Sequence, residues 1–566
     1  DSRGISPESA VMASALRVEL GPLVYFWCSL LLLEERLYAA LSWKRLCESR
    51  FVSREFVLYH AVNVLLWAVC IPTIGETLRE ACMTTHACSA RLRPPSPTFG
   101  GLFEDTNDHQ WRAFRSNLVL LVASNAGATV VATLAQWVIS AVWGRAVGLR
   151  ARRSLRRCAG LATVVVVHGR GASFVFGLTL AAHFSESLAA TWVFALLGLL
   201  VKESRVRRHV RSLDLLSFLG DGLYGWELSL PHVVLRVISY AHDRSVGARP
   251  RHEYTWIDCL AHATYAPVFA TGPTVQFDRF SEQQYATADL PLSKRRQRWA
   301  FVVSYILRTG MALVFLECFT GRYPIFALGA SGAYSKLGGV EFAVFVFLTL
   351  NLMWLKFTII WRCARSLSLF DGVQVPENMR RFVCDTFSIS GFWRGWHSSF
   401  NEWLIRHVYV PLGGRGAGFL AFCGVFGFAT IWHDVEPRLL IWGAMNAVFL
   451  ATERLVRLDQ RAKATARPGV VSAVERGGVA ALGAVYILCL VGTNLLGYAA
   501  GAANALEMLA AGGLKAGAGF GVGFIVLFSG TQAALEVRRL ERIADDEGTE
   551  AKALPPRSAG DGASER

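Results

Sequence analysis

The sequence predicts an all-α protein that crosses a membrane many times. Of its 566 residues, 53% are hydrophobic and only 18% are charged, whereas soluble domains carry about 25% charged residues. The apolar residues are gathered into long runs, such as residues 117–143, 299–319 and 339–361. Each run reaches the ~20 helical residues that cross the ~30 Å hydrocarbon core of a bilayer. This composition excludes a soluble multidomain protein.

Thirteen apolar segments follow one another along the chain, and we expect about eleven to twelve full spans, the rest being re-entrant or interfacial. A single transmembrane domain over residues 1–540 would hold them all. The polar tail at 541–566 contains Pro, Gly and Ser and is expected to be disordered in the cytosol. In chain order the segments cover residues 21–41, 57–75, 117–143, 161–184, 186–201, 223–240, 256–277, 299–321, 339–361, 416–433, 438–454, 477–500 and 516–536.

Basic clusters between these segments predict the orientation of the chain. Successive clusters are separated by two predicted segments, so all of them should share one face, which the positive-inside rule makes cytosolic. Contact with anionic lipid head groups accounts for most of the net charge of +15. Nucleic-acid binding is disfavoured because no soluble domain with interleaved aromatic residues accompanies the charge. The clusters cover residues 145–157, 202–211, 294–298, 362–381 and 453–469.

The loop at 76–116 falls on the opposite, lumenal face and contains two neighbouring cysteines. Cys82 and Cys88 lie in the motif CMTTHAC, where they could form a disulfide. The alternative is a metal site that includes His86, but no second cluster of ligands accompanies it. The sequence thus favours the disulfide.

The segment 391–414, GFWRGWHSSFNEWLIRHVYVPLGG, is unusual for a membrane protein. Residues 392–411 are expected to form one helix lying along the membrane surface, because its aromatic residues recur at helical spacing and Trp favours the head-group level. A plain interfacial anchor helix would explain the Trp and Arg residues. It would not explain why His397 and Asn401 lie so close together with other polar residues.

A second histidine, His433, lies inside an otherwise apolar stretch and is followed by Asp434 and Glu436. A histidine of a helix bundle is often simply hydrogen-bonded, but polar groups at membrane depth are costly enough to suggest function. Neutral imidazole is suited to removing a proton from a hydroxyl or amine that attacks a thioester. His397 could then bind the thioester carbonyl or stabilise the oxyanion. On the predicted topology His397 lies near the cytosolic face and His433 lies deeper, toward the lumen.

In these motifs the chain resembles the membrane-bound O-acyltransferases, and more narrowly their Gup (glycerol uptake protein) and hedgehog acyltransferase-like branch. The resemblance departs from the branch at Tyr240 and Ala241, where Phe and Asn are more usual, which puts acceptor detail in doubt. It covers most of the chain, through DTNDHQWRAFRSN (105–117), LRVISYAHD (235–243), YAPVFATGP (265–273), LNLMWLKFTIIWR (350–362), LFDGVQVPENM (369–379), FWRGWHSSFNEWLIRHVYVPLGG (392–414) and ATIWHDVEPRLLIWG (429–443).

The resemblance implies an all-α membrane fold around a central reaction tunnel, with His433 as the intramembrane catalytic residue. His397 falls where the family has its second catalytic polar residue. No metal and no bound cofactor are expected, and acyl-CoA enters as a co-substrate. The residues expected to bind substrate in the reaction chamber are Trp393, Trp396, Asn401 and Arg406.

The implied activity is transfer of a long acyl chain from acyl-CoA to a membrane lipid hydroxyl in the endoplasmic reticulum, with lyso-GPI as the acceptor during anchor remodelling. A protein acyltransferase of the hedgehog type is the alternative within the class. A polyol transporter, which the name of the branch suggests, is disfavoured because the sequence lacks a detectable internal repeat. An inactive regulatory protein is disfavoured because both His397 and His433 are present.

Overall fold

The computed structural model confirms the all-α prediction for the part of the chain that it describes. Helices dominate, and one antiparallel pair of short strands, β1 (Arg93–Ser96) and β2 (Leu102–Glu104), lies beside them. The first predicted span, 21–41, lies outside the described residues. Described are residues 49–52, 54–96, 102–185, 187–203, 206, 217–247, 250–285, 292–465, 473–499 and 502–553.

Six helical segments among the described residues are long and apolar enough to cross a membrane, so the protein is a multi-pass membrane protein. Three shorter apolar helices accompany them: α9 (Ala172–Phe184), α10 (Leu188–Val201) and α21 (Phe419–His433). The six are Phe56–Met83, which joins α4 (Arg54–Val64) and α5 (Ile71–Met83) through the π-turn η2 (Leu65–Cys70); α7 (His109–Trp143); Ser293–Arg322 of α16 (Leu292–Arg322); α18 (Gly339–Asp371); Ala473–Tyr498, made of α24 (Ala473–Asn494) and the π-turn η11 (Leu495–Ala499); and Gly519–Ile543 of α25 (Ala502–Ala553).

The remaining predicted segments are shorter or broken, so the expected eleven to twelve full spans are not all present as single long helices. The segment predicted at 256–277, for example, is divided between α13 (Trp256–Ala263), α14 (Ala266–Phe269) and a following loop. These connecting helices are α6 (His86–Ser89), α8 (Arg145–His168), α12 (Leu230–Val246), α13 (Trp256–Ala263), α14 (Ala266–Phe269), α15 (Phe277–Tyr285), α17 (Ile325–Ser331), α19 (Ile389–Gly395), α20 (Ser398–Leu404), α22 (Pro437–Leu455) and α23 (Leu458–Thr465).

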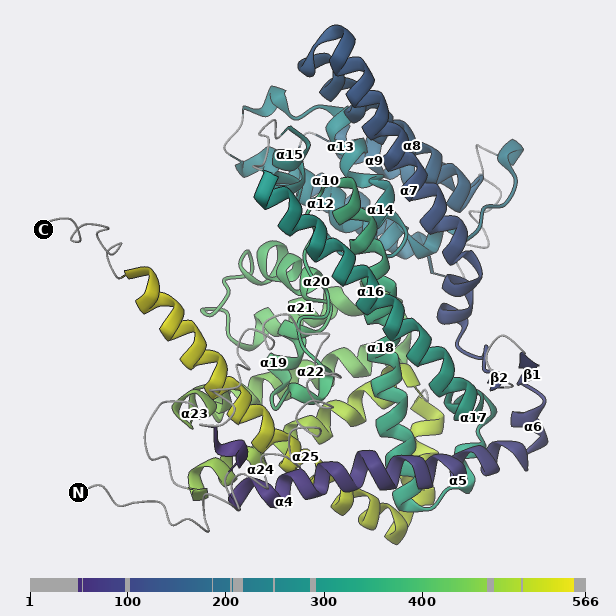
Figure 1. Cartoon of the computed structure of the whole chain (residues 1–566), viewed down its shortest axis with the longest axis vertical. Helices are drawn as coiled ribbons and strands as arrows, with labels where there is room; N and C mark the ends of the chain where they lie inside the picture. The colour runs from purple at the N-terminus through teal and green to yellow at the C-terminus, as the bar shows by residue number, and fades with distance from the viewer. Residues whose placement is uncertain are drawn as a thin grey trace, which may run out of the picture.

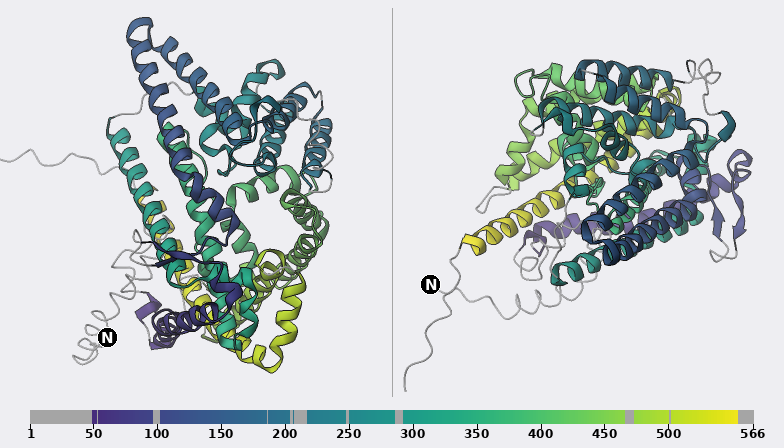
Figure 2. Two further views of the ribbon diagram at one scale, coloured as in Figure 1. Left: turned by 90° about the vertical axis from the view of Figure 1, so that its right-hand side faces the viewer. Right: turned by 90° about the horizontal axis from the view of Figure 1, so that it is seen from above.

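Helices α7 and α8 form a long hairpin at one end of the molecule (Figures 1 and 2). The side chain of Asp108 accepts a hydrogen bond from the Trp111 amide at 2.8 Å and caps the start of α7. Gly144, at φ +85°, ends α7 and reverses the chain. Arg156 donates to Asp371 Oδ1 at 2.9 Å, which places the middle of α8 beside the end of α18. Two of the basic clusters therefore share one face, as predicted.

The prediction for residues 202–211 is wrong at Lys202, the described end of that cluster. The predicted span 161–184 is two antiparallel arms, because α8 ends at His168 and α9 starts at Ala172. Gly169 makes the turn at φ +52°, where a Cβ would lie 2.3 Å from the Gly220 carbonyl oxygen. The extra reversal sends α10 away from the face that holds the start of α8. Lys202 thus lies at the opposite end of this bundle, beside the end of α21.

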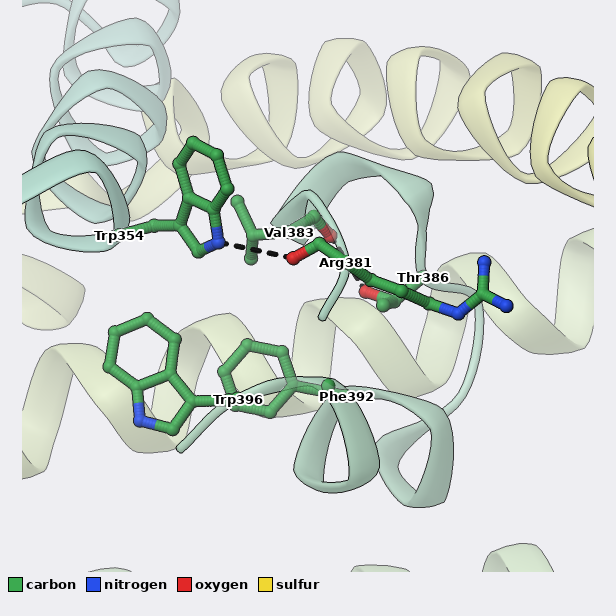
Figure 3. Close-up of a pocket in the computed structure, with 7 residues that line it drawn as sticks. Trp354, Arg381, Val383, Thr386, Phe392 and Trp396 are labelled. Atoms are coloured by element: carbon green, nitrogen blue, oxygen red, sulfur yellow. Dashed lines mark hydrogen bonds between the residues drawn. The ribbon is translucent and has the colours of Figure 1, made fainter. Parts of the chain in front are cut away.

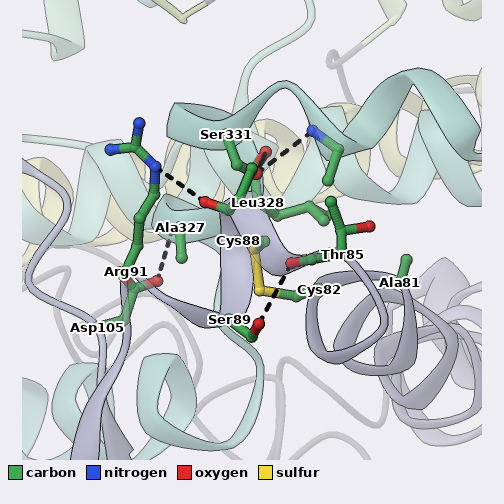
Figure 4. Close-up of a disulfide and its surroundings, with 12 residues drawn as sticks. Ala81, Cys82, Thr85, Cys88, Ser89, Arg91, Asp105, Ala327, Leu328 and Ser331 are labelled. Carbon is green, nitrogen blue, oxygen red and sulfur yellow. Dashed lines mark hydrogen bonds between the residues drawn. A yellow bond between two sulfur atoms is a disulfide. The ribbon is translucent and has the colours of Figure 1, made fainter.

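The loop region that follows α5 is fixed by the predicted disulfide, which joins Cys82 to Cys88 (Figure 4). The bond uses both thiols that a metal site would need. Nearby, the Ala327 amide donates to Asp105 Oδ2 at 2.9 Å and ties the strand pair to α17. Burial raises the pKa of this carboxyl.

The C-terminal helix α25 continues to Ala553, past the domain boundary predicted at residue 541. Arg381 donates two hydrogen bonds of 3.0 Å to the Glu541 carboxylate on this helix. Residues 542–553 include several Ala and Glu, which favour helix. Residues 554–566 lie outside the described part of the chain.

A large apolar core positions the candidate site. It joins α9, α10 and α12 to the region of α20 and α21, and Trp403 is fully buried within it. The Trp403 Nε1 donates to the Leu235 carbonyl oxygen at 2.8 Å, which locks α20 onto α12. This bond holds α12, which is far away in the sequence, against the segment that carries His397.

Candidate active site

The segment predicted as one surface helix over 392–411 is instead three short pieces packed into the protein. Helices α19 and α20 are separated at His397, and a π-helical turn, η10 (Ile405–Tyr409), follows α20. His397 has φ +45°, a left-handed conformation that costs a residue with a Cβ about 1–3 kcal/mol. Asn378 holds this kink, since its carbonyl oxygen accepts from the Ser398 amide at 2.9 Å. The interpretation as a continuous interfacial helix was wrong because long-range hydrogen bonds fix the break.

The His397 ring is enclosed by aromatic side chains from three parts of the chain. It stacks on Trp361 of α18 with ring centroids 4.5 Å apart, and it lies 5.1 Å from Phe400 and 5.8 Å from Trp432. His397 is only 6% exposed, and its Nε2 is buried without a hydrogen-bond partner. Leaving such an atom unpaired costs about 1–3 kcal/mol. A substrate carbonyl would satisfy it.

His433 is the last residue of α21, and unlike its neighbour Trp432 it is exposed. Its ring lies edge-on to three aromatic rings, at 4.8 Å from Trp432, 5.6 Å from Tyr498 and 6.1 Å from Trp442. The residue is therefore accessible, although three aromatic rings surround its imidazole. Such a position allows a base to meet an acceptor molecule.

A third histidine, His232 on α12, belongs to the same cluster and was missed by the sequence analysis. Its ring centroid lies 5.4 Å from that of Trp432, and its Nδ1 is buried without a hydrogen-bond partner. It lies near enough to interact electrostatically with both His397 and His433. The signal was available: His232 interrupts the apolar run LPHVVLRVIS, just as His433 interrupts its own.

Trp432 is the common neighbour of the three histidines and is itself held rigidly. Its Nε1 donates to the Pro231 carbonyl oxygen at 2.9 Å, and its ring stacks on Phe400 at 4.4 Å. The bond to Pro231 also fixes the start of α12, where His232 follows directly. The structure thus brings both predicted catalytic residues, His397 and His433, to one indole.

The predicted substrate-binding residues divide into two groups. Trp393 and Trp396 line the aromatic region: Trp393 donates to Asn446 Oδ1 at 3.3 Å, and Trp396 packs against Phe392 at 5.5 Å. Trp396 also borders a small pocket, in which its ring and that of Phe392 lie opposite Trp354 (Figure 3). Asn401 is half-buried on α20, and its backbone N–H donates to the His397 carbonyl oxygen at 3.0 Å.

Arg406 is paired with two carboxylates. Its guanidinium donates to Asp243 of α12 at 2.6 Å and to Asp278 of α15 at 3.2 Å. The neighbouring His407 is directed to the same region, where its Nε2 lies 3.0 Å from Gln276 Oε1. In this structure Arg406 therefore ties η10 to two other helices.

The model of the membrane-bound O-acyltransferase family matches residues 215–493, a region that contains all three histidines. The chain belongs to this family of acyltransferases. Within it, the relatives place the chain in the Gup and hedgehog acyltransferase-like branch.

Three relatives illustrate the similarity. The chain is 27% identical to the membrane-bound O-acyltransferase gup1 of Schizosaccharomyces pombe over 550 residues, which covers 87% of this chain and 89% of the relative. It is 35% identical to GUP1 of Saccharomyces cerevisiae over 210 residues, covering 37% and 36% of the two chains. It is 28% identical to the protein-cysteine N-palmitoyltransferase HHAT of Mus musculus over 216 residues, covering 36% and 41%.

Proposed function

We propose that this acyltransferase moves a long fatty acyl chain from acyl-CoA to a hydroxyl of a membrane lipid, with lyso-GPI as the acceptor, in the endoplasmic reticulum membrane. The observation that carries the proposal is the exposed His433 at the end of an apolar helix, with His397 across the Trp432 ring. One imidazole is accessible to an incoming acceptor. The other has a buried nitrogen that lacks a partner.

The two histidines have distinct roles in the proposed reaction. His433 accepts the proton of the acceptor hydroxyl while the hydroxyl oxygen attacks the thioester carbonyl carbon. His397 donates a hydrogen bond to the carbonyl oxygen as negative charge develops on it. The carbon–sulfur bond then breaks, and the coenzyme A sulfur takes the proton from His433. The products are an ester and free coenzyme A, with no covalent intermediate on the enzyme.

The aromatic surroundings suit a lipid reaction. Trp442, Tyr498 and Trp432 border His433, and Phe400 with Trp361 borders His397. Such walls bury apolar chains favourably and raise the strength of the few polar contacts between them. The choice of lyso-GPI rests on the resemblance to the Gup branch.

A protein acceptor is the second candidate, and the similarity to the mouse protein-cysteine N-palmitoyltransferase favours it. In that reaction an amine would replace the hydroxyl as the group that His433 deprotonates. The same two histidines would serve both reactions, so the acceptor must be decided by experiment.

In the deciding experiment, purified protein is incubated with labelled palmitoyl-CoA, with lyso-GPI and with a peptide that carries an N-terminal cysteine. We expect label to enter the GPI lipid, and His433→Ala to abolish that incorporation. Label entering only the peptide would transfer the assignment to the protein acyltransferase. Label entering neither acceptor in a His433-dependent manner would refute the proposed function.

A further inference from the structure

Lys202 joins two helices at the point where His433 ends α21. It follows the last residue of α10, and it is only 8% exposed. Its ammonium nitrogen donates to the Trp432 carbonyl oxygen at 2.7 Å and also to the His433 carbonyl oxygen. The residues that it connects are separated by 230 positions in the sequence.

These bonds satisfy backbone groups that a helix leaves open. The last four carbonyl oxygens of an α-helix have no partner within it, and together they carry partial negative charge. At the end of α21 the Asp434 backbone amide donates a hydrogen bond to the Thr430 carbonyl oxygen at 3.0 Å. Lys202 donates to the carbonyl oxygens of Trp432 and His433, and its full positive charge lies where the end of a helix favours one. Asp434 lies near enough to interact electrostatically with the same ammonium.

We propose that Lys202 is a positioning residue for acyl transfer, which fixes the last turn of α21 and thereby the place of the His433 imidazole. The backbone of His433 can be held in two ways, through Trp432, whose indole is bonded to Pro231, and through Lys202. Lys202 is the one that acts on the carbonyl of His433 itself. The inference rests on the proposed role of His433 in the reaction.

The chain offers a matched control in Lys356 of α18. This lysine is also buried, at 3% exposed, and it also joins two helices, because its Nζ donates to Asp108 Oδ2 at 2.6 Å and to Gln110 Oε1 at 3.0 Å. Its partners lie at the start of α7 rather than at the end of α21. Removing it tests what the loss of any buried bridging lysine does to the protein.

The kinetic test compares wild type, Lys202→Met, Lys202→Arg and Lys356→Met as purified full-length chains, with labelled palmitoyl-CoA as donor. We expect Lys202→Met to lower kcat about 10- to 100-fold, since a small misplacement of a catalytic group has effects of that size. The KM for palmitoyl-CoA should stay near the wild-type value. Lys202→Arg should recover much of the lost rate because it keeps the charge and the donors. Lys356→Met should leave kcat near wild type.

Hydrogen exchange provides a reading that does not depend on activity. Amides in the last turn of α21 should exchange faster in Lys202→Met than in wild type, and should be unchanged in Lys356→Met. If wild type transfers no acyl group, the proposed function fails, yet faster exchange would still support the positioning of α21 by Lys202. Unchanged exchange in Lys202→Met would overturn the inference. So would a wild-type kcat in Lys202→Met, or an equal loss of kcat in Lys356→Met.

Discussion

The backbone of His397 constrains which residues can replace it. A left-handed conformation, here φ +45°, is tolerated by Asn, Asp and His better than by most other residues with a Cβ. The Asn side chain can also donate a hydrogen bond, as the imidazole of His397 is proposed to do. One substitution can therefore keep both the kink and the contact with the substrate carbonyl.

We predict that His397→Asn retains measurable acyl transfer and that His397→Ala retains much less. Loss of one oxyanion donor typically costs about 10²–10³ in rate, and the amide should avoid most of that loss. The measurement is kcat for both variants, with thermal unfolding as a check that the kink is preserved. Complete inactivity of a well-folded His397→Asn would instead indicate an obligatory proton transfer by His397.

The partners of Arg406 could not be predicted from the sequence. The motif suggested a substrate-binding side chain, whereas the structure pairs the guanidinium with Asp243, a carboxylate that is 2% exposed. The partner lies 163 residues away. No local pattern predicts such a pairing. His232 was missed for another reason: it lies outside the motifs that carry the family resemblance, the nearest of which begins at residue 235.

Arg406→Met should destabilise the protein more than it changes substrate affinity. It leaves the buried Asp243 without its main partner, and we expect a loss of about 2 kcal/mol after allowing for solvent around the half-exposed guanidinium. Thermal unfolding of the detergent-solubilised protein and the KM for palmitoyl-CoA should be measured together. An unchanged unfolding midpoint with a raised KM would restore the substrate-binding role.

At the scale of elements, α19 is placed by a buried carboxylate from another helix. Glu453 of α22 is 3% exposed and accepts hydrogen bonds from the Ile389 amide and from the amide and hydroxyl of Ser390. These groups open α19, where a negative charge is favourable. Since α19 leads directly to His397, the cap helps to fix the position of the kink at His397.

Glu453→Gln should lower the free energy of unfolding by about 1–2 kcal/mol, because it removes the charge and turns one acceptor into a donor. Thermal unfolding tests the change, and Glu453→Asp serves as the control that keeps the charge. If Glu453→Gln unfolds at the wild-type temperature, the cap does not contribute as the structure indicates.

The long helices could be predicted from the sequence, and the short ones could not. The runs at 117–143, 299–321 and 339–361 lie within α7, α16 and α18, where hydropathy alone is sufficient. The errors fell at Gly169, where a turn divides a predicted span, and at His397, where a kink divides a predicted helix. Hydropathy registers burial, but these breaks depend on close backbone contacts and hydrogen bonds from distant parts of the chain.

The extra turn at Gly169 changes which loops share a face. Three helices, α8, α9 and α10, instead of two segments connect the basic start of α8 to Lys202, which lies beside the end of α21. Charge counting placed both on the cytosolic face because it treated 161–184 as one span. The number of crossings counted between the two clusters was too small.

Cysteine accessibility in sealed microsomes tests this arrangement. In a background without the exposed native Cys158, Cys318 and Cys423, Arg150→Cys should react with an impermeant maleimide from the cytosolic side. Val206→Cys should react only after the membrane is permeabilised. Labelling of Val206→Cys in sealed vesicles would support the original prediction and contradict the structure.

The most direct test of the central claim is acyl transfer from labelled palmitoyl-CoA to lyso-GPI by membranes that carry wild type, His433→Ala or His262→Asn. His262 is a buried histidine of α13 that lies 2.9 Å from the Val275 carbonyl oxygen, and it controls for the loss of a structural imidazole. We predict that transfer is lost only in His433→Ala, which should remain expressed and folded. Undiminished transfer by His433→Ala, or an equal loss in His262→Asn, would contradict the claim that His433 is the catalytic base.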